Sequence, residues 1–283
     1  MLLSTEIGVS NPSYSSFDKR ALESLSLKEE CHLSIQLGLN GFSFCIRNDN
    51  QILGLETYDF ALSLIEDKLA QISWLKEPYA SYDLCLTTKK HVLIPNPIFD
   101  INEKENYLSF NHRKTDSLVV LSDHISTLDS QLVYGVSKAE QDLVQTFFPN
   151  ATLKHLCTQF LPFILSENKN RKDVKMIANL SHNQLQLIVV DQSKFKYYNV
   201  FSYKNAHDCI YYILFAFEQL ELNPEVVTLE LLGNVNKDSE LYELAFNYIR
   251  HVKFGKSKVL MSPNIEKLSN HQHYTLVHQH LCE

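Results

Sequence analysis

Glycine is scarce in this sequence, with 7 residues among 283, whereas about 7% is typical of proteins. Phosphate-binding loops depend on glycine, because only a backbone without Cβ can wrap closely around a phosphate with its N–H groups pointing inward. Of the seven, only Gly38 and Gly41 lie close together. No Walker, Rossmann, nucleophile-elbow or Ser-His-Asp pattern occurs, so the sequence indicates no catalytic residue.

Long apolar runs and an excess of basic charge are also missing. The longest apolar stretches, such as 209–217, fall well short of the roughly 20 residues that a membrane-spanning helix needs. The first residues lack the basic and apolar regions of a secretory signal. The formal net charge is −7, whereas binders of nucleic acid or anionic lipid need clustered Lys and Arg. We therefore expect neither membrane insertion nor direct nucleic-acid binding.

The cysteines and histidines give little sign of a disulfide or a metal site. Six cysteines are scattered, most of them among apolar neighbours, and buried free thiols in a reducing compartment are the simplest account. We therefore expect a cytoplasmic protein without a structural disulfide. On a strand, His278, His280 and Cys282 would share one face and could meet one metal ion. A histidine-rich chain end is the favoured interpretation, so we expect no metal and no other cofactor.

What the sequence does contain is a repeated pattern. Residues 32–58 read as three strands joined by turns, of which Asn40-Gly41 is a strong hairpin signal. An amphipathic stretch over 60–75 and an apolar strand over 82–86 follow. The same order recurs about 140 residues later, with strands over 174–180, 184–190 and 194–201, a helix over 205–220 and a strand over 226–232.

Strand-strand-strand-helix-strand, twice, is the plan of the actin-like ATPase fold. This ribonuclease H-like α/β fold, built on mixed sheets (α+β), has two similar halves around a cleft. Two unrelated α+β domains could share the pattern by chance. We predict the duplicated fold, with an N-terminal extension over 1–30, a first half over 31–172, and a second half with a C-terminal tail over 173–283.

Two stretches are specific enough to suggest a family. The first is NVFSYKNAHDCIYYILF over 199–215, and the second is LIPNPIF over 93–99. On these residues the chain resembles DUF3822, a family of Bacteroidetes proteins, from about residue 31 to 254 and again at its last two residues. The resemblance implies an actin-like ATPase fold and a cytoplasmic setting, but no established activity. More distantly, the layout is similar to actin-like cytoplasmic proteins of pilus and type II secretion machines.

The resemblance to actin-like ATPases also implies three cleft loops, and here each has lost residues that the chemistry needs. Working members carry acidic, glycine-rich loops whose carboxylates organise Mg²⁺ while backbone N–H groups hold phosphate. No carboxylate stands at the matching positions, so we expect a vestigial cleft. Turn geometry alone would also account for the glycines. The loop residues are Gly38, Asn40 and Gly41 after Gln36, then Asn179 and Ser181, then Gly233 and Asn234.

Two functions follow from an intact fold with degenerate loops. The first is a non-enzymatic pseudo-ATPase that acts by binding an unidentified protein. The alternative is a divergent nucleotide-binding ATPase or kinase-like enzyme that uses unfamiliar residues. The aromatic helix with Tyr211, Tyr212, Phe215 and Phe217 could form an exposed docking surface, but packing against the sheet is the favoured interpretation.

Overall fold

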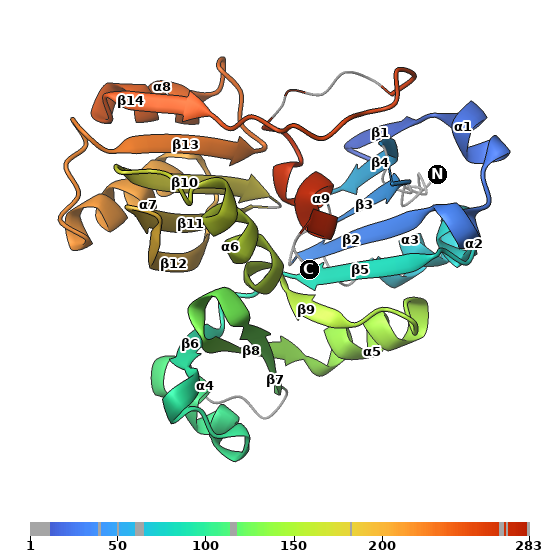
Figure 1. The fold of residues 1–283 in the computed structure, drawn as a ribbon, viewed down its shortest axis with the longest axis horizontal. Coiled ribbons are helices and arrows are strands. Elements are labelled where there is room, and N and C mark those ends of the chain that lie inside the picture. The colour runs from blue at the N-terminus through green and yellow to red at the C-terminus, as the bar shows by residue number, and fades with distance from the viewer. Residues whose placement is uncertain are drawn as a thin grey trace, which may run out of the picture.

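Three β-sheets organise the chain (Figure 1). The computed structural model describes residues 12–38, 41–49, 51–59, 65–113, 118–181, 183–265, 269 and 271–281. Among these residues, no helix is both long and apolar enough to cross a membrane.

Sheet I has six strands in the order β1-β4-β3-β2-β5-β9. β2 pairs antiparallel with β3 and parallel with β5, so a meander and a parallel crossover share one sheet. The strands are β1 (Tyr14–Phe17), β2 (His32–Gly38), β3 (Gly41–Arg47), β4 (Ile52–Tyr58), β5 (Ser81–Leu86) and β9 (Leu153–His155). Its helices are α1 (Lys19–Ser24), α2 (Leu27–Glu30), α3 (Ile65–Gln71), α5 (Lys138–Phe147) and α6 (Leu156–Glu167).

Sheet II repeats the plan of sheet I in the order β12-β11-β10-β13-β14. This order and its strand directions match β4-β3-β2-β5-β9, so the predicted recurrence of strand order is confirmed. The inner strands are buried on both faces, which is why they read as near-continuous apolar runs. The elements are β10 (Val174–Ser181), β11 (Gln184–Asp191), β12 (Lys194–Ser202), β13 (Thr228–Gly233), β14 (His251–Phe254), α7 (Ala206–Gln219) and α8 (Glu240–Tyr248).

The helix α7 begins where Asn205 caps it, with the Asn205 Oδ1 accepting the Asp208 N–H at 2.9 Å. Phe217 packs into the core, as the sequence favoured. The same expectation was wrong for Tyr211 and Phe215, which are 61% and 41% exposed. These two residues are four apart and lie on the helix stripe that faces away from the sheet.

A smaller sheet, in the order β6-β8-β7, is inserted between β5 and α5. The sequence had suggested no elements here. Helix α4 covers one face of this sheet through Leu108, which packs on Ile94 and Val133. Tyr134 and Leu132 join the main core instead. The elements are β6 (His91–Pro95), β7 (Leu118–Ile125), β8 (Ser130–Ser137) and α4 (Lys104–Asn111).

After β14 the chain returns to sheet I, as the red segment in Figure 1 shows. The Ile52 N–H donates to the Leu260 carbonyl, and the Ser262 N–H donates to the Ile52 carbonyl, each at 2.9 Å. Helix α9 (Tyr274–His278) then lies over β2 and β3. Its Leu276 and Val277 form a buried cluster with residues of sheet I. The predicted tail is therefore part of the covering layer of sheet I.

The small sheet meets the large ones at a buried histidine. His155 is fully buried and caps α6, with its Nδ1 accepting the Cys157 N–H at 3.0 Å. The Asp123 carboxylate of β7 accepts hydrogen bonds from the backbone N–H of His155 and from the Thr158 hydroxyl, each at 2.8 Å. Burial lowers the pKa of His155 to about 3 and that of neighbouring His91 to about 4.

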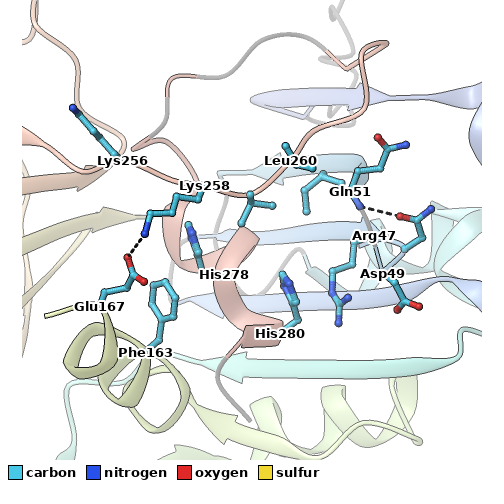
Figure 2. Close-up of a pocket in the computed structure, with 13 residues that line it drawn as sticks. Arg47, Asp49, Gln51, Phe163, Glu167, Lys256, Lys258, Leu260, His278 and His280 are labelled. Carbon is cyan, nitrogen blue, oxygen red and sulfur yellow. Dashed lines mark hydrogen bonds and ion pairs between the residues drawn. The ribbon is translucent and has the colours of Figure 1, made fainter. Parts of the chain in front are cut away.

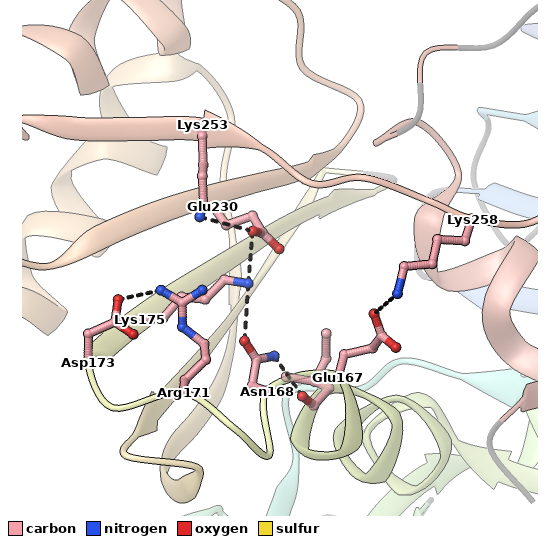
Figure 3. Close-up of polar contacts among 9 residues, drawn as sticks. Glu167, Asn168, Arg171, Asp173, Lys175, Glu230, Lys253 and Lys258 are labelled. Carbon is pink, nitrogen blue, oxygen red and sulfur yellow. Dashed lines mark hydrogen bonds and ion pairs between the residues drawn. The ribbon is translucent and has the colours of Figure 1, made fainter.

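A largely buried ion pair between β10 and β13 lies beside the end of α6 (Figure 3). The Lys175 Nζ lies 2.8 Å from the Glu230 Oε2 and donates to the Asn168 Oδ1 at 3.3 Å. Asn168 ends α6 and donates its Nδ2–H to the Ile164 carbonyl at 2.7 Å. Burial lowers the pKa of Lys175, and Glu230 opposes that shift. The hydrogen bond from Lys175 to Asn168 thus ties the end of α6 to sheet II.

Replacing Lys175 with methionine should destabilise the protein by about 3 kcal/mol, because it leaves the Glu230 carboxylate buried without its main cation. Lys253→Met is the matched control, since the Lys253 Nζ lies 4.0 Å from the same carboxylate but the side chain is 46% exposed. Lys253→Met should lower the free energy of unfolding far less than Lys175→Met does. Urea unfolding measures both variants, and equal losses would contradict the assignment.

Stability should fall as the pH drops from about 6.5 towards 3. The folded protein keeps His155 neutral, while the unfolded chain takes up a proton below the ordinary pKa of 6.5. His155→Asn retains a capping oxygen but cannot titrate. Urea unfolding at several pH values should give a shallower acid dependence for this variant than for the wild type. An unchanged slope would show that His155 does not contribute.

Candidate functional site

The ends of β2, β10 and β13 meet at a polar cavity of about 340 Å³ between the two large sheets. Four residues predicted from the loop pattern line it together: Asn179, Ser181, Gly233 and Asn234. Gly38 and Gly41 pair at the end of the β2–β3 hairpin and do not line it. Asn40 lies outside the described residues. Other lining residues are Ser13, Tyr14, Gln36, Ser43, Thr57, Asp59, Leu180, Gln272, His273, Thr275 and Leu276.

Gly233 occupies a backbone conformation that side chains avoid. Its φ is +82°, and a Cβ there would lie 2.0 Å from the Leu180 carbonyl oxygen. The turn it makes places the Asn234 N–H 2.8 Å from that same oxygen. The Gly233 N–H itself donates to the His271 carbonyl at 2.7 Å. Turn geometry therefore requires this glycine, and its backbone donor is already used within the chain.

Neutral polar side chains form the buried base of the cleft. The Thr275 hydroxyl donates to the Gln36 Oε1 at 3.1 Å. On the other side, the Asn179 Nδ2–H donates to the Gln186 Oε1 at 3.4 Å. The Gln186 Nε2–H in turn donates to the Thr87 Oγ1 of sheet I at 3.4 Å. Amides and hydroxyls from both sheets thus bond to one another without a charge, while the buried Gln36 Nε2 has no partner among the described residues.

One carboxylate of the cleft escaped the sequence analysis. Asp59 directly follows β4, is exposed and lines the cavity. Its charge adds to burial in raising the pKa of Tyr203, which follows β12 in sheet II. The sequence pattern could have predicted this position. The third strand of a meander, here β4, ends at the same edge of the sheet as the first strand, here β2. Attention to the hairpin turns alone missed it.

The C-terminal segment supplies one wall of the cleft. The His271 Nε2 lies 2.6 Å from the Val235 carbonyl of sheet II. The Gln279 Nε2–H donates to the Ile35 and Asp83 carbonyls of sheet I, at 3.2 and 2.7 Å. The segment therefore bridges the two sheets beside the cavity.

Among the described residues, the histidines of this segment form no metal site. The His278 Nδ1–H donates to the Tyr274 carbonyl at 2.8 Å, and its Nε2 lies 3.3 Å from the Ser257 hydroxyl. Cys282 lies outside the described residues. Within the part of the chain that the structure describes, no group of three or more His, Cys, Asp or Glu side chains is placed to bind a metal ion.

A second cavity, of about 280 Å³, lies beside His278 and His280 and contains none of the predicted cleft residues (Figure 2). The Lys258 Nζ pairs with the Glu167 carboxylate at 3.5 Å on one side. Arg47 lies on the other side. Burial lowers the pKa of His280 to about 4, and the positive charge of Arg47 adds to this effect. The cavity is therefore lined by charges of both signs, with Arg47, Lys256 and Lys258 against Asp49 and Glu167.

The matching strand orders of the two large sheets and the cleft between them are typical of the actin-like ATPase fold. The chain is similar to a Bacteroides thetaiotaomicron protein with actin-like ATPase fold and unknown function, with 22% identity, a TM-score of 0.74 and coverage of 90% of this chain and 97% of that chain. It is also similar to a chain of the PilM–PilN type IV pilus biogenesis complex, with 12% identity, a TM-score of 0.58 and coverage of 88% and 95%.

The family follows from the sequence. The profile of the family described as Protein of unknown function (DUF3822) matches residues 23–252, and the chain belongs to this family. No curated protein matches the sequence.

Replacing Gly233 with alanine should destabilise the fold by about 1–3 kcal/mol or more, because alanine resists a positive φ and its Cβ would meet the Leu180 carbonyl. Gly135→Ala is the control, since its Cβ would meet only the Leu108 and Leu118 side chains, at 3.0 Å or more. Thermal unfolding should show a clearly larger loss for Gly233→Ala. A comparable loss in both would contradict the special role of this turn.

Proposed function

We propose that this chain is a non-catalytic actin-like protein, a pseudo-ATPase that acts by binding another protein. The neutral chemistry of the cleft carries the proposal: Gln36, Asn179 and Thr275 line it with amides and a hydroxyl. An amide oxygen can ligate Mg²⁺ but cannot neutralise its charge. Phosphoryl transfer relies on positioning and on charge neutralisation by a held metal ion. A cleft of this composition is poorly suited to that reaction.

The backbone of the third loop supports the same proposal. In a phosphate-binding loop, N–H groups point at the ligand. Here the Gly233 N–H donates to the His271 carbonyl at 2.7 Å, so a phosphate oxygen would have to displace the chain's own acceptor.

Protein binding is the favoured use of the fold. A similar chain occurs in the PilM–PilN complex, which gives this fold a precedent in a protein assembly. The five cysteines that the structure describes are free and buried, as is usual in a reducing compartment, so we place the protein in the cytoplasm. The matching strand orders support an internal duplication, with an extension over 1–30, a first half over 31–172 and a second half over 173–283.

A divergent nucleotide-binding enzyme is the second candidate, and Asp59 favours it. This carboxylate lines the cleft and could hold a hydrated Mg²⁺ ion. The buried Gln36 Nε2 has no hydrogen-bond partner among the described residues, so it could donate to an acceptor on a ligand.

Phosphate release from Mg-ATP should not exceed the background of the buffer, because the buried base of the cleft is neutral and Asp59 is the single carboxylate among its described lining residues. The assay uses full-length protein, with calorimetry of Mg-ATP binding alongside. Asp59→Asn should behave like the wild type in both measurements.

Turnover that depends on Mg²⁺ and disappears in Asp59→Asn would overturn the proposal in favour of the second candidate. Asp49→Asn is the matched control, since Asp49 is an exposed carboxylate outside the cleft. Gly233 is unsuitable for this test, because its replacement disturbs the fold itself.

A further inference from the structure

Two neighbouring helices of sheet II expose large aromatic side chains. On α7, Tyr211 is 61% exposed and stacks on Phe215, with ring centroids 6.1 Å apart. On α8, Phe246 and Tyr248 are 63% and 56% exposed. Phe246 and Tyr248 are two residues apart and therefore lie on different sides of α8, so we call Tyr211 and Phe215 of α7 the aromatic face. Large exposed apolar side chains that lie together are typical of binding surfaces.

The two helices run side by side. Both cross from one strand to a parallel strand of sheet II, so right-handed connections place them on the same side of the sheet. Their first turns are joined by the His207 Nδ1 and the Glu240 Oε1, 3.4 Å apart, and the helices contact each other. The carboxylates of α8 therefore lie on the helix next to the aromatic face.

The charged side chains on these two helices, apart from His207, are all acidic. Helices α7 and α8 together contain four carboxylates and neither Lys nor Arg. Glu218 near the end of α7 and Glu243 on α8 are exposed, and Glu221 directly after α7 is exposed as well. The basic residues of this region lie beside the helices rather than on them: Lys237 lines a small hollow with Glu243 and Phe246, and the exposed Arg250 pairs with Glu225. The aromatic face is thus flanked by negative charge.

We propose that the aromatic face is the docking surface for the partner, and that the partner presents a basic segment with interspersed apolar residues. This inference rests on the proposed function as a protein-binding pseudo-ATPase. Lys and Arg side chains of such a segment gain cation–π contact with the rings and ion pairs with the flanking carboxylates. Its apolar side chains remove the exposed rings from water.

The charge also selects among possible occupants. A second copy of this chain would bring an equally acidic surface to the aromatic face, and like charges brought together cost free energy. An acidic partner would meet the same repulsion. A basic partner instead gains long-range attraction from a protein whose formal net charge is −7.

The test uses two synthetic amphipathic helical peptides that share leucine positions and carry either lysine or glutamate elsewhere. Binding to the full chain is measured by fluorescence anisotropy. The lysine peptide should bind, and added salt should weaken it. The glutamate peptide should not bind. Tyr211→Gln with Phe215→Gln should lower the affinity for the lysine peptide at least about tenfold, while glutamine preserves helix propensity.

Phe110→Gln is the matched control, because Phe110 is 88% exposed on α4 of the small sheet. It should change the affinity less than about twofold, the usual effect of a residue outside the interface. Charge reversal at Glu218 and Glu243 to lysine should weaken the lysine peptide and admit the glutamate peptide. Sedimentation of the full chain should give a species that is unaffected by the aromatic substitutions.

Three results would overturn the inference: equal binding of both peptides, an affinity unchanged by Tyr211→Gln with Phe215→Gln, or a dimer that those substitutions dissociate. None of these results touches the pseudo-ATPase proposal, which is decided by phosphate release from Mg-ATP. Turnover in that assay would reject the proposed function even if the aromatic face binds the lysine peptide.

Discussion

One apolar core is shared by both large sheets, and the other features of the molecule depend on it. Ile177 and Val190 of sheet II lie in the same buried cluster as Ile35 of sheet I and Phe160 of α6. Burial of this surface is the dominant favourable term in folding. Because the sheets share one core, their strand ends are held beside each other, and the cleft is the polar margin at which that core ends.

The neutral side chains of the cleft are consistent with this position. Gln36, Asn179 and Gln186 are nearly inaccessible to water, and a carboxylate buried there would need a cation to offset its desolvation. Amides can satisfy one another instead, as Asn179 and Gln186 do. Charge is retained in the interior at Lys175, where the Glu230 carboxylate lies 2.8 Å away. The same physical rule therefore explains the uncharged buried base of the cleft and the paired charge at Lys175.

The contacts of the C-terminal segment could not be predicted from the sequence. Its contacts join residues far apart in the chain, such as Ile52 with Met261 and Gly233 with His271. No local sequence pattern predicts such pairings, so the sequence indicated only a tail in this segment. The small sheet was missed for a related reason, since β6 pairs with β8 rather than with the next strand. The aromatic helix α7 was misread in part, because apolar residues occupy both its inner and its outer stripe.

The sequence alone determined the local elements and the limits on chemistry. Alternation and turn residues predicted two meanders, and the repeat predicted one strand order for both large sheets, because side-chain period and turn preference act over a few residues. The scarcity of glycine predicted weak phosphate loops. Only the tertiary structure decided that Asp59 lines the cleft, that the Gly233 N–H is bonded within the chain, and that Tyr211 faces water. These outcomes depend on which distant surfaces are buried together, and that is fixed by packing of the whole chain.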